Sequence, residues 1–396
     1  MSRRKVITIM GTRPEVIKLA PVIRELERCK ATFDHIVVTT AQHREMLDQV
    51  LKVFRIEPDI DLNLMQRDQS LANFASRSLV SLSNMLYEMR PDAVLIQGDT
   101  TTVMTAALAA FYQDIRVGHV EAGLRSFDNR SPFPEEINRR MATCLTDMHF
   151  APTEGARRNL LREGTPDENI FVTGNTIVDA LKSIPLEGCF DDERLEQIDF
   201  NHQRILLVTA HRRENHGERL RSICRALRTL ADSFDDVEVI YPVHLNPNVR
   251  AVVRDELSDV PRVHLVEPVT YSDLLRLMKN CYLILTDSGG IQEEAPSFHK
   301  PVLVLRELTE RPEIIDSGAG KLVGADVSRI VEEASLLLND NLEYDAMSVV
   351  ENPFGDGHAA ERIVQILAGE LHLPTRKESK QSFIQVSGHG LMPTRC

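Results

Sequence analysis

The chain has 396 residues, of which 42% are hydrophobic and 27% charged, and its formal net charge is -13. This profile is typical of a globular protein with room for two domains of ordinary size. The negative charge argues against a general binder of nucleic acid or of anionic membranes, because both need a basic surface. A small anionic ligand is not excluded, since a pocket can be locally basic.

The chain carries no sign of export or membrane insertion. No stretch approaches the roughly 18–20 apolar residues of a spanning helix, so no membrane association is expected. The first ten residues include basic ones, but their apolar run is too short for a secretory signal and is typical of a strand. The cysteines have no CxxC spacing, which favours reduced thiols and a cytoplasmic location; they are Cys29, Cys144, Cys189, Cys224, Cys281 and Cys396.

Short β-branched runs alternate with longer segments of helical periodicity. The runs in the first half are KVITIM (5–10), DHIVVTT (34–40), DAVLIQG (92–98) and RVGHVEA (116–122). Those in the second half are RILLVTA (204–210), VEVIYPV (237–243), RVHLVEP (262–268), CYLILTD (281–287) and KPVLVL (300–305). Strands that alternate with helices predict an α/β fold of βαβ units, and apolar strands predict parallel sheets covered on both faces.

A polar, charged segment near 185–203 separates the two series. We therefore expect one doubly wound domain over 1–184 and a second over 185–358, with a cleft between them, where ligands commonly bind. The helical stretch 357–371 fits either domain. The last segment, 373–396, is polar and unpatterned, and we expect it to be disordered.

The segment LILTDSGGIQEEA places two glycines between a strand and a helix. Such turns lie at the carboxyl ends of parallel strands, where ligands bind, and free N–H groups at a helix start favour an anion. Ser288, Gly289 and Gly290 are therefore candidates for binding a phosphate or diphosphate, and Glu294 for binding a ribose diol. The alternative is a helix start that uses glycine for packing, with Glu293 and Glu294 as first-turn acids.

The turn MGTRPEVIK follows the first predicted strand and has a similar character. Arg13 lies in the loop, Lys18 lies on the helix behind it, and Pro14 suits a first helical turn. Arginine binds phosphate oxygens through paired hydrogen bonds, so the two turns predict a diphosphate held from both domains. The alternative is that Arg13 pairs with Glu15 or another acid.

Several side chains that can transfer protons stand where catalytic groups collect. Asp99, Glu121 and His211 each follow an apolar strand, and Glu135 begins a helix after a proline-rich loop. The structural alternatives are an N-cap for Asp99, a first-turn acid for Glu135 and an ordinary loop histidine for His211. Acids near a diphosphate are better candidates for proton transfer than for binding. No HExxH motif or Cys/His cluster occurs, so no metal site is predicted.

Ten sequence blocks run in order from about Lys5 to about Leu371: GTRPE, TAQHREMLDQVL, GDTTT, GHVEAGLR, SPFPEEINRR, TGNTIVDAL, TAHRREN, YPVHLNPNVR, LTDSGGIQEEAP and TERPE. Together they resemble the non-hydrolysing UDP-N-acetylglucosamine 2-epimerases. The resemblance implies a glycosyltransferase-B-like fold of two Rossmann-like domains, with a C-terminal helix at about 359–372 that crosses back to the first. It also implies a homodimer that interconverts UDP-GlcNAc and UDP-ManNAc for surface polysaccharides, without NAD or a metal.

The resemblance extends to individual positions. Bacterial members often need UDP-GlcNAc as an allosteric activator, and Gln42, His43 and His244 fall in blocks that line this regulatory site. Gln97 stands where a histidine is common before GDTTT, and we expect this departure not to touch the acids. The positions that match the family's catalytic residues are Asp99, Glu121, Glu135 and His211.

The implied mechanism follows from the chemistry of the sugar. The C2 hydrogen is not next to a carbonyl, so its direct removal would leave an unstabilised carbanion. Loss of UDP from C1 as the C2 proton leaves gives 2-acetamidoglucal, and re-addition with protonation from the other face gives the epimer. Arg13 and either Arg212 or Arg213 are expected to stabilise the departing UDP. Asp99 and Glu121 are the preferred proton-transfer pair, and the residues leave open which acts first.

Other functions stay open on the sequence. A glycosyltransferase of the same architecture would use a UDP-sugar donor and need an acceptor. A 2-epimerase could act on a modified UDP-GlcNAc, and a hydrolysing epimerase would release free ManNAc and UDP. A catalytically silent sensor would bind UDP-GlcNAc without forming a product.

Overall fold

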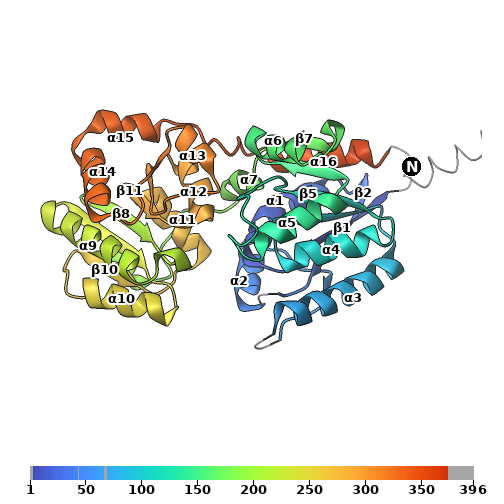
Figure 1. Cartoon of the computed structure of the whole chain (residues 1–396), viewed down its shortest axis with the longest axis horizontal. Helices are drawn as coiled ribbons and strands as arrows, with labels where there is room; N and C mark the ends of the chain where they lie inside the picture. The colour runs from blue at the N-terminus through green and yellow to red at the C-terminus, as the bar shows by residue number, and fades with distance from the viewer. Residues whose placement is uncertain (1–2, 43, 67–68, 373–396) are drawn as a thin grey trace, which may run out of the picture.

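The computed structural model describes residues 3–42, 44–66 and 69–372. They form two lobes that lie side by side, each built on its own parallel sheet (Figure 1). Within these ranges, no helix is both long and apolar enough to cross a bilayer. The tail 373–396, which we expected to be disordered, lies outside the described residues.

The first lobe contains a parallel sheet that has seven strands within the described ranges, in the order β3-β2-β1-β4-β5-β6-β7. The direction of winding reverses between β1 and β4, which is the switch point where doubly wound sheets bind ligands. The strands are β1 (Arg4–Met10), β2 (Phe33–Thr39), β3 (Ile60–Asp61), β4 (Ala93–Gln97), β5 (Arg116–Val120), β6 (Met148–Ala151) and β7 (Ile170–Val172).

Helices cover both faces of this sheet. Two of them begin with a defined cap at the switch point: α1 has a capping box between Thr12 and Glu15 with Pro14 in its first turn, and Thr100 caps α4. The helices are α1 (Arg13–Arg28), α2 (Arg44–Phe54), α3 (Leu71–Met89), α4 (Thr101–Phe111), α5 (Glu135–Leu145), α6 (Glu154–Arg162) and α7 (Thr176–Lys182), with a 3-10 turn, η1 (Asp167–Asn169).

The second lobe repeats this plan with a parallel sheet that has six strands in the part of the chain described, in the order β10-β9-β8-β11-β12-β13. Its switch point lies between β8 and β11. The strands are β8 (Arg204–Thr209), β9 (Val237–Pro242), β10 (Val263–Val266), β11 (Leu283–Thr286), β12 (Val302–Val304) and β13 (Gly320–Leu322).

The helices of the second half follow the same alternation. The short α8 (Glu193–Glu196) lies in the segment between the two sheets. The others are α9 (Glu218–Ser233), α10 (Pro247–Leu257), α11 (Tyr271–Asn280), α12 (Gly289–Glu294), α13 (Pro312–Asp316), α14 (Val327–Asn339), α15 (Asn341–Ser348) and α16 (Ala359–Glu370), with two 3-10 turns, η2 (Arg213–Asn215) and η3 (Ala295–Phe298).

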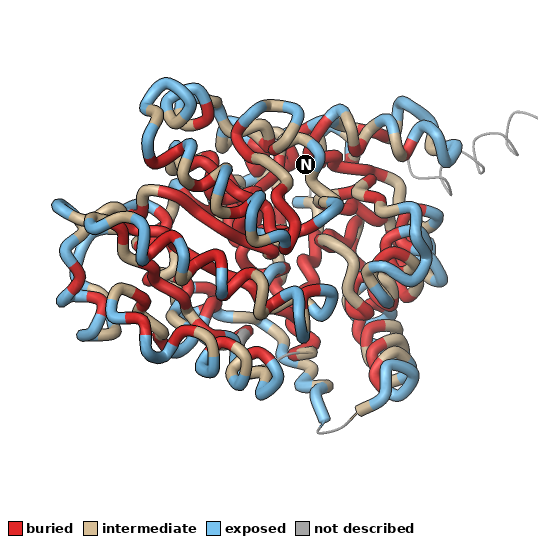
Figure 2. The backbone as a smooth tube through the Cα atoms, turned by 60° about the vertical axis from the view of Figure 1, so that its left-hand side comes forward, coloured by how far each residue is buried: buried red, intermediate tan, exposed pale blue. Residues whose placement is uncertain are grey.

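Buried residues run through the interior of both lobes along the strands (Figure 2). Every residue of β4 and β11 is buried, as expected for strands covered on both faces. All nine predicted strands are present, and β3, β6, β7 and β13, which are only two to four residues long, were not predicted. Length alone does not explain this, because β10, β11 and β12 are equally short; those three lie in longer apolar runs of the sequence, which the four missed strands lack.

The last helix joins the second lobe back to the first. The helix α16 packs against α1 and α7 of the first lobe. Asp179 of α7 accepts the backbone N–H groups of Ala359, at 3.2 Å, and Ala360, at 2.9 Å. The Asp179 carboxylate therefore caps the N-terminus of α16 from another helix, because the N-cap residue of α16 makes no side-chain hydrogen bond itself. The domain limits 1–184 and 185–358 stay a prediction.

Candidate active site

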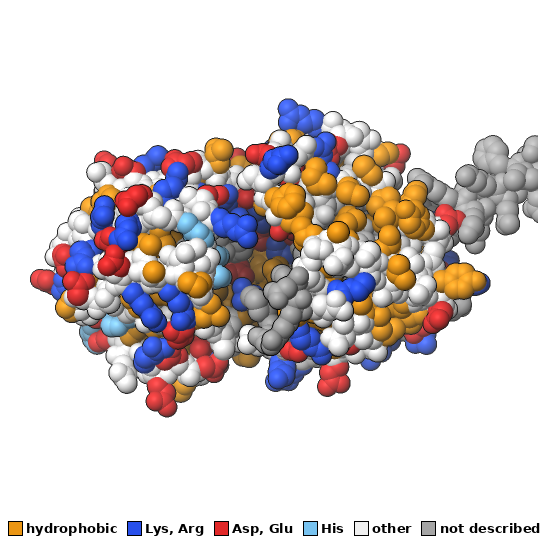
Figure 3. All heavy atoms as spheres, turned by 60° about the horizontal axis from the view of Figure 1, so that its bottom comes forward, with side chains coloured by type: hydrophobic (Ala, Val, Ile, Leu, Met, Phe, Trp, Pro, Cys, Tyr) orange, Lys and Arg blue, Asp and Glu red, His pale blue; other side chains and the backbone are white. Residues whose placement is uncertain are grey.

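Both switch points open onto the space between the lobes, and the predicted residues gather there. In the first lobe Arg13 follows β1, Asp99 follows β4 and Glu121 follows β5, while in the second His211 follows β8 and Ser288 follows β11. A space-filling view shows a hollow between the lobes with lysine, arginine and histidine side chains at its margin (Figure 3). The candidate site is therefore made by two facing strand edges.

Glu121 is held in an unusual backbone conformation. Its φ is 64°, in the left-handed region that is strained for a residue other than glycine and that is enriched at functional sites. Its two carboxylate oxygens accept hydrogen bonds from Lys18 Nζ and from Gln97 Nε2. The expectation that Gln97 does not touch the acids was therefore wrong, because neighbouring parallel strands bring Gln97 and Val120 into register beside Glu121.

Lys18 links Glu121 to the second lobe. Its side chain is 9% exposed, and Nζ lies 2.8 Å from Oε2 of Glu293 on α12. Oε1 of Glu293 accepts a hydrogen bond from Arg311 Nε at 2.8 Å. Burial raises the pKa of Glu121, with the charge of Lys18 opposing, whereas Lys18 and Arg311 overcome burial to lower the pKa of Glu293. Lys18 therefore already pairs with two carboxylates. It can attract an anionic ligand only together with the charges of these two partners.

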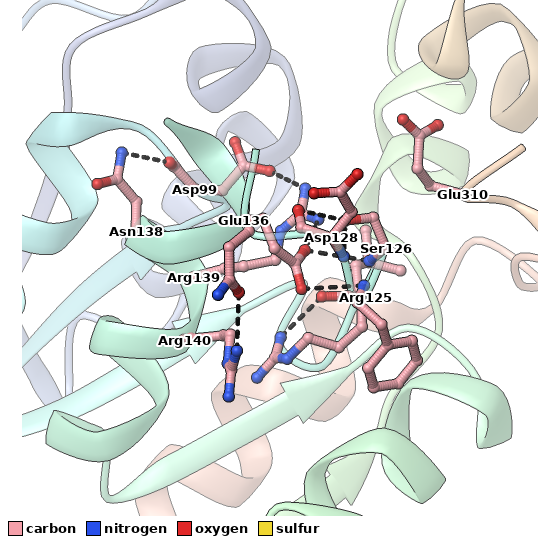
Figure 4. Close-up of polar contacts among 12 residues, drawn as sticks. Asp99, Arg125, Ser126, Asp128, Glu136, Asn138, Arg139, Arg140 and Glu310 are labelled. Atoms are coloured by element: carbon pink, nitrogen blue, oxygen red, sulfur yellow. Dashed lines mark hydrogen bonds and ion pairs between the residues drawn. The ribbon is translucent and has the colours of Figure 1, made fainter. Parts of the chain in front are cut away.

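Asp99 faces a buried arginine on α5. Its Oδ2 accepts a hydrogen bond from Arg139 Nη2, and its backbone oxygen accepts one from Asn138 Nδ2 at 3.0 Å. Arg139 also donates to Glu136 at 2.8 Å, and Figure 4 shows this guanidinium reaching both carboxylates. The alternative of Asp99 as an N-cap is wrong, because the next residue, Thr100, caps α4.

Glu135 lies at the start of α5, beside this cluster. Burial raises its pKa, and the nearby charge of Asp99 adds to the increase, whereas Arg139 and Arg212 act against it. Arg212 belongs to the second lobe, so the charges that act on Glu135 come from both sides of the cleft. Its neighbour Glu136 is fully buried and accepts the backbone N–H groups of residues 126 and 127, which is a structural role.

Arg13 is the first residue of α1 and does not pair with Glu15. The carboxylate of Glu15 instead accepts hydrogen bonds from the backbone N–H of Gly11, from that of Thr12 at 3.1 Å and from the Thr100 hydroxyl. Arg13 forms no ion pair with a residue in the described ranges. Its charge acts on the pKa values of Glu294 and His211 in the second lobe. Arg13 therefore lies within electrostatic reach of the second lobe, and its guanidinium forms no hydrogen bond or ion pair with the described residues.

His211 is positioned by a buried aspartate that follows β11. Asp287 Oδ2 accepts the backbone N–H groups of His211 and Arg212, each at 2.8 Å, and its Oδ1 lies 3.6 Å from His211 Nδ1. The imidazole stacks on that of His244, with ring centroids 5.1 Å apart. Burial lowers the pKa of His211, although Asp287 opposes this change. This arrangement favours a neutral imidazole at pH 7.

The glycine turn has the open geometry that an anion requires. Ser288 precedes α12 without capping it through its side chain, so the first-turn N–H groups are not used by that hydroxyl. A Cβ on Gly290 would make only an ordinary contact, 4.0 Å from Oγ of Ser288, whereas one on Gly289 would lie 3.1 Å from Cζ of Arg311. The turn therefore presents backbone amides backed by a guanidinium.

The two glutamates after this turn are not the first-turn acids of the alternative interpretation. They lie at the end of α12, and both are buried. Glu294 accepts a hydrogen bond from the Tyr271 hydroxyl at 2.8 Å, and burial raises its pKa to about 7. Glu293 belongs to the cluster with Lys18. Two acids buried in this way point to roles beyond helix stabilisation.

Of the two candidate arginines after β8, only Arg212 lies in the cleft. Its Nη1 is 3.9 Å from Oε1 of Glu310, and its charge acts on Glu135. Arg213 lies in η2, is exposed and forms no ion pair within the described part of the chain. Arg212 is the better candidate for an anion contact.

Comparison with known proteins identifies the family. A family model described as UDP-N-acetylglucosamine 2-epimerase matches residues 24–368. The chain belongs to the UDP-N-acetylglucosamine 2-epimerase family. It is 49% identical over 383 residues to the UDP-N-acetylglucosamine 2-epimerase of Bacillus subtilis, covering 97% of this chain and 99% of that protein. It is 51% identical over 369 residues to that of Escherichia coli K12, covering 92% and 98%.

Solved structures of this family share the fold. The chain superimposes on UDP-GlcNAc 2-epimerase from Neisseria meningitidis bound to UDP-GlcNAc with a TM-score of 0.84 and 48% identity, covering 92% of this chain and 99% of that one. The predicted fold, glycosyltransferase-B-like with two Rossmann-like domains facing across a cleft, is confirmed. The recognition of the epimerase family from its ten sequence blocks is confirmed as well.

Two of the three regulatory positions implied by the family resemblance, Gln42 and His244, lie close to the candidate site. Gln42 accepts hydrogen bonds from Thr102 at the first turn of α4, at 2.9 Å from its hydroxyl and 3.2 Å from its backbone nitrogen. His244 is exposed and stacks on His211, a predicted catalytic residue of the epimerase. His43 lies outside the described residues. A ligand that contacts His244 would therefore touch a neighbour of the candidate site.

Three site residues were missed on the sequence: Arg139, Asp287 and Arg311. Arg311 had a usable signal, because the segment Arg-Pro-Glu begins a helix in each lobe, at 13–15 and at 311–313. Asp287 lies in the segment LILTDSGGIQEEA, where the prediction rested on Ser288 and the two glycines. Within the described residues, no group of three or more His, Cys, Asp or Glu side chains is arranged to hold a metal ion.

Proposed function

We propose that the chain catalyses the reversible epimerisation of UDP-GlcNAc to UDP-ManNAc at C2, by elimination of UDP and its re-addition. The observation that carries the proposal is the convergence of Asp99, Glu121 and Glu135 on a cleft whose opposite wall bears a glycine turn and His211. The curated epimerases share about half of their residues with this chain over nearly its whole length. The product would supply ManNAc for a surface polysaccharide.

The carboxylates would move the proton at C2. Elimination needs a base on one face of the sugar, and protonation of the glycal needs an acid on the other face. General acid–base help of this kind contributes about 10²–10⁴-fold in rate. Glu121, buried with a raised pKa, suits a group that changes its protonation state, and Asp99 is held by Arg139 at the neighbouring strand end. Glu135 is the third candidate.

The leaving group would be held by the two turns. Arg13, without an ion-pair partner in the described ranges, and the first amides of α12 offer positive charge to a departing diphosphate. Arg212 adds a third contact from the second lobe. Ser288, Gly289 and Gly290 would line the diphosphate, and Glu294 the ribose. Lys18 would act through Glu121.

Incubation of the pure protein with UDP-GlcNAc alone tests this function. The expected result is UDP-ManNAc at equilibrium with substrate, and deuterium at C2 of the product when the reaction is run in D₂O. Unlabelled UDP-ManNAc would exclude elimination. Free ManNAc with UDP would indicate a hydrolysing enzyme, and no product without an added acceptor would favour a glycosyltransferase or a sensor. The same assay with modified UDP-GlcNAc derivatives shows which substrate is preferred.

Substitution of the acids tests the assignment of roles. Asp99→Asn and Glu121→Gln are expected to keep UDP binding and to lose at least ~10²-fold in kcat/KM. Asp167→Asn is a matched control. Asp167 is a surface acid that pairs with Arg157, and neither residue belongs to the turns after β4 and β5 that carry Asp99 and Glu121. Near-normal turnover in both acid variants would remove them from proton transfer.

A homodimer is proposed on the family resemblance and on one apolar surface. Helices α3, α4 and α5 of the first lobe leave large apolar side chains exposed, among them Val80, Tyr87, Phe111 and Met141. Figure 3 shows hydrophobic side chains gathered on the half of the molecule that this lobe forms. Light scattering should give a dimer mass that Val80→Glu lowers to a monomer, while Leu342→Glu, on α15 of the other lobe, leaves it unchanged.

Two further properties are proposed with this function. UDP-GlcNAc would also act as an allosteric activator at Gln42, His43 and His244, seen as a sigmoidal rate curve that His244→Ala makes hyperbolic. A cytoplasmic location is supported by the free state of the five cysteines in the described residues.

A further inference from the structure

Four charged side chains form a buried chain across the lobes: Glu121, Lys18, Glu293 and Arg311. Their side chains are between 1% and 13% exposed, and Glu293 is the most buried, at 1%. Glu293 holds both cations, with Arg311 Nε on one oxygen and Lys18 Nζ on the other, each at 2.8 Å. Two positive and two negative charges lie together with little water to screen them.

This balance matters because one of the four changes its charge during the proposed reaction. When Glu121 takes up a proton it becomes neutral, and Lys18 loses one of its two anionic partners. A buried ammonium without a partner is strongly unfavourable. Glu293 remains beside Lys18 and keeps it neutralised, so the protonated state of Glu121 is tolerated.

We propose that Glu293, from the second lobe, is a positioning residue that makes Glu121 an effective proton acceptor by holding Lys18. The inference rests on the proposed function, and it adds a residue of the opposite lobe to the proton-transfer machinery. Proton transfer by Glu121 then depends on the closed arrangement of the lobes, because opening them would separate Lys18 from Glu293.

The direction of the effect follows from the groups that face Glu121. They are Lys18 on α1, Glu293 on α12 and Arg311 before α13, with the neutral amide of Gln97 on β4. Removing the charge of Glu293 takes away the only anion of this set and leaves both cations. The ionised form of Glu121 is then favoured, so its pKa falls and it becomes a weaker base.

The test compares Glu293→Gln with the wild type and with Glu313→Gln. Glu313 also bridges the lobes, where it accepts a hydrogen bond from Thr153 at 2.6 Å, but it does not belong to the cluster. The protonation of Glu121 is followed by infrared difference spectroscopy, with its carboxyl band assigned through Glu121→Gln. The pH profile of kcat/KM and the affinity for UDP are measured on the same proteins.

In Glu293→Gln the Glu121 titration and the acid limb of the pH profile should both move down by about one pH unit. UDP affinity should change less than threefold, and Glu313→Gln should titrate as the wild type. Glu293→Asp keeps the negative charge, but its shorter side chain reaches only one of the two cations. The Glu121 titration should therefore shift in the same direction by a smaller amount. If Glu293→Gln does not fold, Glu293→Asp supplies the test.

A wild-type Glu121 titration in Glu293→Gln or Glu293→Asp, or an equal shift in Glu313→Gln, would overturn the inference. The infrared titration needs no turnover. The two ideas can therefore fail separately. If the wild type forms no UDP-ManNAc but the Glu121 titration still shifts in Glu293→Gln, the proposed function is refuted, and the effect of Glu293 on Glu121 still stands.

Discussion

Replacement of Arg139 should have a large and specific effect. Its side chain is 6% exposed and holds Glu136, which is 0% exposed, as well as Asp99. Arg139→Gln leaves a fully buried carboxylate without its cation, and breaking such a pair by removing one partner costs about 3–5 kcal/mol. The free energy of unfolding should fall by this amount, and kcat/KM should fall by ~10²-fold as Asp99 loses its orientation.

The next residue in the chain supplies the control. Arg140 has a side chain that is 47% exposed, and it lies 3.6 Å from Glu163, so Arg140→Gln should cost at most about 1 kcal/mol and leave activity unchanged. Urea unfolding at pH 7 can be followed by far-ultraviolet circular dichroism, because the chain has no tryptophan. If the two variants differ by less than about 1 kcal/mol, the buried pair does not stabilise the site as argued. Arg139→Lys should recover only part of the loss, since an ammonium does not span both carboxylates.

Other regions of the molecule give further predictions. Neighbouring arginines overcome burial to lower the pKa of Glu310 to about 2. Its contribution to stability is therefore full above pH 4.5 and is lost as the pH falls towards 2, so Glu310→Gln should be less stable than wild type at pH 7 in urea unfolding and approach it at pH 2. Asp179→Ala should cost about 1 kcal/mol in the same assay by uncapping α16, and proteolysis should then remove this helix faster. Gln97→Leu removes a donor to Glu121 and should lower kcat/KM by about tenfold in the epimerase assay, with unchanged UDP affinity.

The architecture was predictable because it depends on repeated local signals. Each long strand has an apolar run, and each run ends in a glycine or polar turn, so the alternation of strand and helix can be read without knowledge of contacts. The carboxyl ends of parallel strands must share an edge, which is why Asp99 and Glu121 were expected near one another. The strand order itself, with its switch points at β1/β4 and β8/β11, came only from the structure.

The partners of the site residues could not be predicted in the same way. Arg139 lies 40 residues from Asp99, and Lys18 is separated from Glu293 by most of the chain. The sequence pattern around a charged residue on a helix surface does not indicate which distant residue it pairs with. The role of Glu15 was more accessible, since Thr12 and Glu15 have the spacing of a capping box, which explains why this acid does not engage Arg13.

The charges in the cleft also resolve an apparent conflict in the site. A cleft lined with carboxylates should repel a nucleotide diphosphate, yet Asp99, Glu293 and Glu310 each have an arginine partner in place. The acids are thus neutralised locally, within hydrogen-bonding distance, and contribute little field at the anion position. Within the described part of the chain, Arg13 pairs with no acid, and no N-cap side chain occupies the first amides of α12. The same cleft can therefore attract a diphosphate and also hold the carboxylates that proton transfer requires. The diphosphate is bonded to C1 of the sugar, and the carboxylates act at the neighbouring carbon, C2.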